Sequence, residues 1–113
     1  MGTINGVDFD RVLDDAVKAA KAVVNDNWDE VKEIVENIGK GLINDVSFVA
    51  KKKLSGEFNE EDAKVFIDDQ KMLARIRLRS VAIITLQLSE RIWNAIANVF
   101  RVAINSAIGW DVL

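Results

Sequence analysis

The sequence of 113 residues contains no histidine, cysteine, tyrosine or proline. Without histidine and cysteine, Ser–His and Cys–His nucleophile systems and His-containing zinc sites are excluded. The sequence also has no glycine-rich phosphate loop, nucleophile elbow or nucleotide-binding fingerprint. We therefore expect a protein that is not an enzyme and that binds no cofactor.

The absence of proline is typical of a mostly helical chain, because proline breaks helix interiors. Half of the residues are hydrophobic, and the length suits one domain with a buried core. The net charge is −3, with ten acidic and five basic residues in 8–50 against two and six in 71–113. This asymmetry fits two oppositely charged helical segments side by side, so we expect an all-α fold.

The first half of the chain reads as one long helix, over about 8–54, with Asp8 as its N-cap. Its apolar residues recur at helical spacing and stay on one side throughout. Bends are expected near 25–27, where Asn27 and Glu30 have the spacing of a capping box, and near 39–41, where two glycines each cost about 1 kcal/mol. The apolar side of this helix consists of Phe9, Leu13, Ala16, Ala20, Val23, Val24, Val31, Ile34, Val35, Ile38, Leu42 and Val49.

A turn over 55–59 and a second helix over about 60–108 follow, with Asn59 as the N-cap. Residues 75–88 alternate like a strand, but neither turn signals nor a partner strand accompany them, so helix is expected. The predicted fold is a long antiparallel helical hairpin, which bends could divide into a four-segment bundle. A further bend is expected near 77–80, because the apolar side changes there.

Before this point the expected buried side consists of Val65, Phe66, Met72, Leu73 and Ile76. After it, residues 80–108 are apolar over more than half of the circumference, which one partner helix cannot cover. Each large aliphatic side chain left in water forgoes about 1.5–3 kcal/mol, so we expect a homo-oligomer, most simply a dimer that completes a four-helix bundle. Its expected interface consists of Val81, Ile84, Leu88, Ile92, Trp93, Ile96, Val99, Phe100, Ile104 and Ile108.

A polar stripe runs along the same segment, formed by Gln87, Glu90, Asn94, Asn98 and Arg101. A stripe facing solvent is the simpler interpretation, and a polar seam between copies of the helix is the alternative. Among these residues Glu90 has apolar neighbours, so we expect it to pair with an arginine such as Arg101 or one from a partner.

The sequence therefore predicts a non-enzymatic scaffold, adaptor or regulator that acts through its apolar C-terminal helix. One alternative is a membrane-active protein that lays this helix on lipid, with Trp93 and Trp110 at the interface. A second is a metal-binding bundle that uses carboxylates such as Glu36 and Glu90. Nucleic acid is not favoured, because the arginines form no broad basic face. No signal peptide or membrane span is recognised, so the expected compartment is the cytoplasm.

Overall fold

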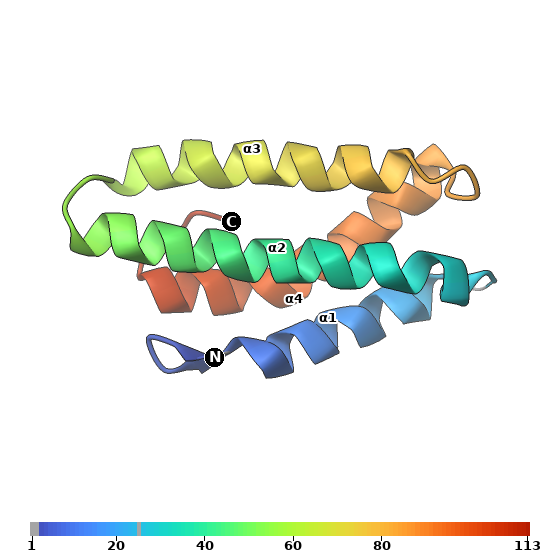
Figure 1. Ribbon diagram of the computed structural model, residues 1–113, viewed down its shortest axis with the longest axis horizontal. Coiled ribbons are helices and arrows are strands. Elements are labelled where there is room, and N and C mark those ends of the chain that lie inside the picture. The colour runs from blue at the N-terminus through green and yellow to red at the C-terminus, as the bar shows by residue number, and fades with distance from the viewer. Residues whose placement is uncertain (1–2, 25) are drawn as a thin grey trace.

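The computed structural model describes residues 3–24 and 26–113, which form four helices packed side by side (Figure 1). Consecutive helices run in opposite directions, and the bundle measures 44 × 24 × 18 Å. The predicted all-α class is confirmed. The helices are α1 (Phe9–Val23), α2 (Trp28–Leu54), α3 (Glu60–Arg79) and α4 (Leu86–Ile108).

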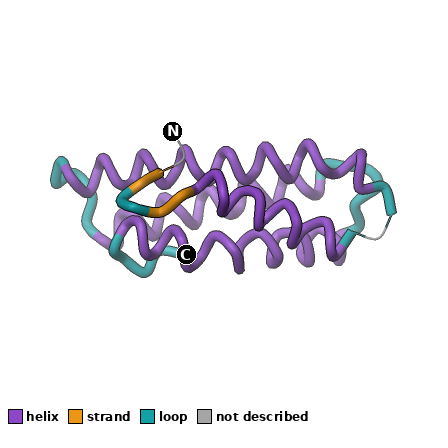
Figure 2. The backbone as a smooth tube through the Cα atoms, turned by 90° about the horizontal axis from the view of Figure 1, so that it is seen from below, coloured by secondary structure: helices purple, strands orange, loops and turns teal. Residues whose placement is uncertain are grey.

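A small hairpin precedes the bundle (Figure 2). Strand β1 (Thr3–Ile4) pairs antiparallel with β2 (Val7–Asp8), and Asn5 and Gly6 both have positive φ between them. An Asn-Gly pair with this geometry is the preferred two-residue hairpin turn. The Asn5 side chain donates a hydrogen bond of 2.7 Å to the Ala107 carbonyl, which attaches the hairpin to the end of α4.

The helix expected over 8–54 is divided into α1 and α2, which fold back on each other at 24–27. Asp8 caps α1 as predicted, since its carboxylate accepts from the backbone N–H groups of Asp10 and Arg11. Asn27 stands at the start of α2 in the left-handed conformation without a side-chain capping bond, so the predicted capping box is wrong. Residue 25 lies outside the described residues. No helix boundary falls at 39–41, because α2 continues through both glycines.

The turn at 55–59 lies where it was expected. Asn59 and Asp62 form a reciprocal capping box at the start of α3, with hydrogen bonds of 2.8 and 3.1 Å. The second long helix is also divided, because the chain leaves α3 after Arg79 and α4 begins behind its N-cap, Thr85. The 75–88 segment is thus helical at both ends and irregular over 80–85.

Helix α4 packs against α1, α2 and α3. Phe100 of α4 stacks on Phe9 of α1 with ring centroids 6.4 Å apart. Most of the apolar side of this segment is covered within the single chain, because three helices pack against α4 where one hairpin partner had been assumed, while Ile83, Leu86 and Val102 stay exposed. Seven of the ten predicted interface residues are buried in the core of the single chain: Ile84, Ile92, Trp93, Ile96, Phe100, Ile104 and Ile108. The other three, Val81, Leu88 and Val99, pack partly buried against it.

Candidate functional site

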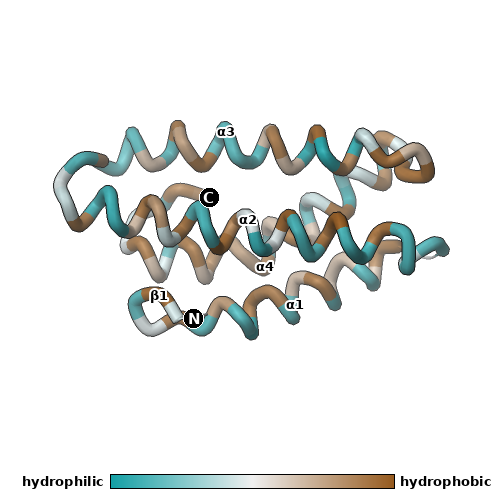
Figure 3. The backbone as a smooth tube through the Cα atoms, in the orientation of Figure 1, coloured by the Kyte–Doolittle hydropathy of each residue, from teal (hydrophilic) through white to brown (hydrophobic). Residues whose placement is uncertain are grey.

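Helix α3 carries exposed apolar residues of the kind that α4 was expected to carry. Hydrophobic and hydrophilic residues alternate along it (Figure 3). Val65, Met72 and Ile76 are 58%, 61% and 56% exposed. Their spacing of seven and four residues places them on one side of the helix, and Asp69 lies on the same line. We call Val65, Asp69, Met72 and Ile76 the α3 stripe.

The buried side of α3 is the opposite of the one that the sequence predicted. The helix packs against α2 and α4 through Ala63, Ile67, Ala74 and Leu78, all buried. Two of these four residues are alanines, whose small side chains let neighbouring helices approach closely. Of the five residues expected to be buried, Phe66 alone is partly buried, packed against the core.

The charges of α3 divide sharply between its two halves. Residues 60–69 contain five acids and one base, whereas residues 70–79 contain four bases and no acid. The acidic half lies next to the turn at 55–59, and the basic half ends at the loop before α4. The helix therefore carries a net charge of −4 at one end of the stripe and +4 at the other.

One ion-pair cluster joins the basic half of α3 to α4. Arg75 Nε donates to Glu90 Oε2 at 3.1 Å, Arg75 Nη2 donates to Glu90 Oε1, and Arg79 Nη2 lies 3.7 Å from Oε2. The hydrogen bond from Arg75 holds the pKa of Glu90 below its usual value. Glu90 is thus paired with arginine as expected, although with arginines of α3 rather than with Arg101.

The remaining members of the predicted polar seam lie on the surface of the single chain. Gln87, Asn94, Asn98 and Arg101 are exposed. Arg101 donates to the Asn98 side chain at 3.0 Å and to the Leu113 carbonyl at 3.3 Å. In the single chain, this stripe therefore faces solvent and the C-terminal tail.

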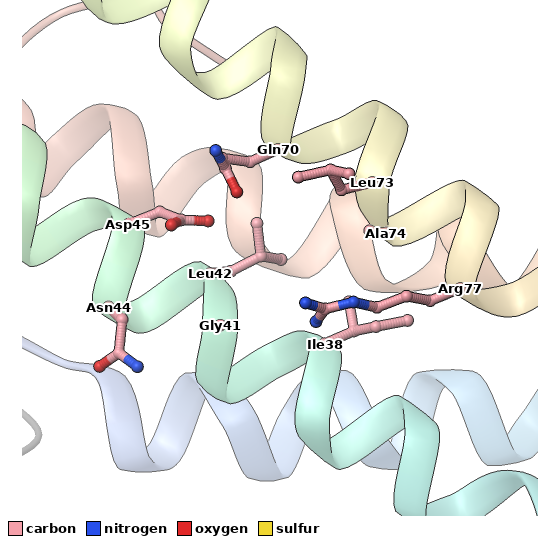
Figure 4. A pocket seen from close by; sticks show the side chains of 9 residues that line it. All are labelled: Ile38, Gly41, Leu42, Asn44, Asp45, Gln70, Leu73, Ala74 and Arg77. Carbon is pink, nitrogen blue, oxygen red and sulfur yellow. The ribbon is translucent and has the colours of Figure 1, made fainter.

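A cleft of about 180 Å³ lies between α2 and α3 (Figure 4). Asp45 and Gln70 lie at one end, Arg77 reaches toward α2 at the other, and apolar side chains lie between them. Among the described residues, no ion pair within 4.0 Å involves Asp45. The cleft is lined by Ile38, Gly41, Leu42, Asn44, Asp45, Gln70, Leu73, Ala74 and Arg77.

The environment of Asp45 is unusual for an aspartate. Burial raises the pKa of its carboxyl to about 6, and the charge of Arg77 lowers it only in part. The sequence analysis missed this residue, although a signal was present. Asp45 stands seven residues after Ile38 and four before Val49, on the side of α2 that was identified as apolar.

The carboxylates considered for metal binding are not grouped: within 3–24 and 26–113, no cluster of three or more acidic side chains could hold a metal ion. Over the same residues, no helix has both the length and the apolarity needed to cross a membrane. Comparison of the chain with protein-family models, with curated proteins and with solved structures finds no match.

Proposed function

We propose that the protein is a non-enzymatic scaffold or regulator that works as a homodimer, and that its two copies meet through the α3 stripe. The observation that carries this proposal is the exposure of more than half of the surface of Val65, Met72 and Ile76 along one side of a helix at the edge of the bundle. Exposed apolar surface on one side of an element can mark an interaction site in a soluble protein, and here Asp69 separates Val65 from Met72 and Ile76. The sequence-based hypothesis placed the interface on the C-terminal helix, whereas this proposal places it on α3.

The charges of α3 favour a second copy as the partner. In a two-fold antiparallel contact, the acidic half of each α3 lies beside the basic half of the other. If Val65 lies opposite Ile76 of the second copy, then Asp62 lies opposite its Arg79. The same surface is thus complementary to itself, which an isologous dimer requires.

The expected affinity is modest. Full burial of a large aliphatic side chain contributes about 1.5–3 kcal/mol, and the three apolar residues are already nearly half buried. Six such side chains per dimer then contribute about 5–10 kcal/mol, against an association cost of about 4–15 kcal/mol. The most favourable combination leaves about 6 kcal/mol, so we expect a weak dimer with a dissociation constant of about 40 µM or higher.

Sedimentation velocity of the full chain, from about 1 to 500 µM, tests the proposal. A monomer–dimer equilibrium is expected, and Ile76→Glu should shift it to monomer. Val102→Glu is the matched control, because Val102 is 74% exposed on α4, away from the stripe. A monomer at every concentration, or a dimer that survives Ile76→Glu, would overturn the proposal. Flotation of such a monomer with liposomes would favour the lipid-surface alternative instead.

A second measurement tests whether the two α3 helices of the dimer run antiparallel. Because the sequence has no cysteine, Glu61→Cys gives a single position for a spin label. Antiparallel pairing in the register above places the two labels about 28 Å apart along the axes, and parallel pairing places them at about 10 Å, the helix separation. Added salt should weaken the antiparallel dimer, since it screens the acid–base contacts. Close labels would contradict the antiparallel arrangement.

A further inference from the structure

The cleft between α2 and α3 holds one acidic and one basic side chain at separate ends. Because the two helices run antiparallel from the turn at 55–59, Asp45 faces Gln70, and Arg77 lies about two turns further along α3, beside Gly41. A Cβ placed on Gly41 would lie 4.0 Å from Arg77 Nη1. The guanidinium therefore lies above the glycine while the Asp45 carboxylate stays apart from it (Figure 4).

The space between the charges is small and partly apolar. Leu42, Leu73 and Ala74 line it between its polar ends. Drug-sized ligands occupy pockets of about 300–1,000 Å³, which exceed the 180 Å³ here. At about 30 Å³ per water in the liquid, the cleft has room for about six water molecules, and hence for a ligand of similar size.

Two opposite charges select against ligands that carry only one. A cation beside Asp45 would be repelled by Arg77, and an anion beside Arg77 would be repelled by the carboxylate. A molecule with one positive and one negative group satisfies both ends. Gln70 adds an amide next to Asp45, whose oxygen can accept a hydrogen bond from an ammonium.

We propose that this cleft binds a small amino-carboxylate zwitterion, with its ammonium at Asp45 and Gln70 and its carboxylate at Arg77. The apolar floor contacts the carbon chain between the two groups. Few atoms take part, so the expected dissociation constant is about 0.1–1 mM. None of the residues that line the cleft belongs to the α3 stripe.

Two-dimensional amide NMR of the full ¹⁵N-labelled chain tests the proposal. Glycine, alanine, β-alanine and 4-aminobutyrate are titrated separately to about 10 mM at about pH 7.5. Saturable shifts are expected at Gly41, Gln70 and Ala74 for at least one probe, and the probe that binds best reports the length that spans the cleft. Propylamine and propionate, which carry one charge each, should bind at least tenfold more weakly.

Single substitutions test whether Asp45 and Arg77 each contribute to binding of the zwitterion. Asp45→Asn and Arg77→Gln should each weaken binding at least tenfold, whereas Arg91→Gln, which changes an exposed arginine of α4 outside the cleft, should leave it unchanged. Gly41→Leu should abolish binding by filling the space. Binding should also weaken as the pH falls through about 6, where Asp45 takes up a proton.

Two outcomes would overturn the proposal. One is the absence of saturable shifts for all four zwitterions, as expected if Arg77 closes on Asp45 in solution and fills the cleft itself. The other is binding that survives both charge-removing variants. The monomeric variant Ile76→Glu separates this proposal from that of the dimer, since it should bind the zwitterion as the parent chain does.

Discussion

Replacing Asp45 by asparagine is expected to stabilise the protein at neutral pH, although the substitution removes a charge near an arginine. Burial raises the pKa of Asp45 from 3.8 to about 6. Between these values the folded chain holds a proton that the unfolded chain releases, so the contribution of Asp45 to the free energy of unfolding falls as the pH rises. Above about pH 6 the ionised carboxylate is therefore unfavourable in the folded state.

The size of the expected stabilisation follows from the difference between the pKa of Asp45 in the folded chain and its usual value. A rise from 3.8 to about 6 corresponds to at most about 3 kcal/mol. The cleft is open to solvent, which screens the charge, so about 1–2 kcal/mol is a better expectation. Asparagine keeps the size and loses the charge. Asp45→Asn should therefore raise the free energy of unfolding by about 1–2 kcal/mol at about pH 7.5, and should have little effect at about pH 4.

Urea unfolding followed by circular dichroism measures the effect, and the quantity to compare is the difference between parent and variant. The pKa values of Glu57 and Glu90 are lowered by their hydrogen bonds to Lys52 and Arg75, so these two groups lose their stabilising contribution at acid pH. Because parent and variant share these two groups, their contribution cancels in the difference between the two free energies of unfolding. Asp15→Asn, at an exposed position on α1, is the control. An Asp45→Asn variant no more stable than the parent at about pH 7.5 would refute the reasoning.

Three further predictions concern the bundle itself. Gly41→Ala should stabilise α2 by about 0.5–1 kcal/mol in urea unfolding, whereas Gly39→Ala should lose that gain, because its Cβ would collide with the Leu13 side chain. Glu90→Gln should cost about 0.5–1 kcal/mol in the same assay, and the cost should shrink in high salt; an unchanged cost would contradict the ion-pair interpretation. Asn105→Ala removes the acceptor of two backbone amides of the C-terminal tail, at 2.9 and 3.1 Å, so hydrogen exchange at both should accelerate; unchanged exchange would contradict a tail held by Asn105.

Local signals in the sequence predicted the helix ends well and the breaks between helices less well. Asp8 and Asn59 cap helices where their side chains suggested it, because capping depends on a few neighbouring backbone groups. The fold-back at 24–27 was underestimated. Two antiparallel helices that cover one core each turn their apolar side toward it, so an unbroken periodicity does not distinguish them from one straight helix.

The hairpin at the N-terminus was missed although its signal, Asn5-Gly6, is present. Each strand has only two residues, too short for an alternating pattern to register. The long-range hydrogen bond from Asn5 to Ala107 joins the hairpin to α4, and Ile4 and Val7 pack against the core. No local reading of the sequence brings Asn5 and Ala107 together.

The largest error concerned α3, which has two apolar sides. One side carries Val65, Met72 and Ile76, and the helical spacing of its apolar residues led to its prediction as the buried side. The structure buries the row with Ala63 and Ala74 instead. Periodicity identifies the apolar sides of a helix. Which side is buried depends on how closely the neighbouring helices approach, and the periodicity of one helix does not contain that information.

The sequence predicted a wide apolar arc on α4 that a second copy would cover, and the structure covers most of this arc within the single chain. A helix with a wide apolar arc needs several neighbouring helices to cover it, and these helices can belong to the same chain or to another. Helices α1, α2 and α3 cover most of the apolar side of α4, and Val65, Met72 and Ile76 are exposed on α3, at the edge of the bundle. That helix presents its stripe to solvent, and it lines the cleft through Gln70, Leu73, Ala74 and Arg77, none of which belongs to the stripe. Substitutions at Ile76 and at Asp45 therefore act on different surfaces, and association and ligand binding can be measured independently.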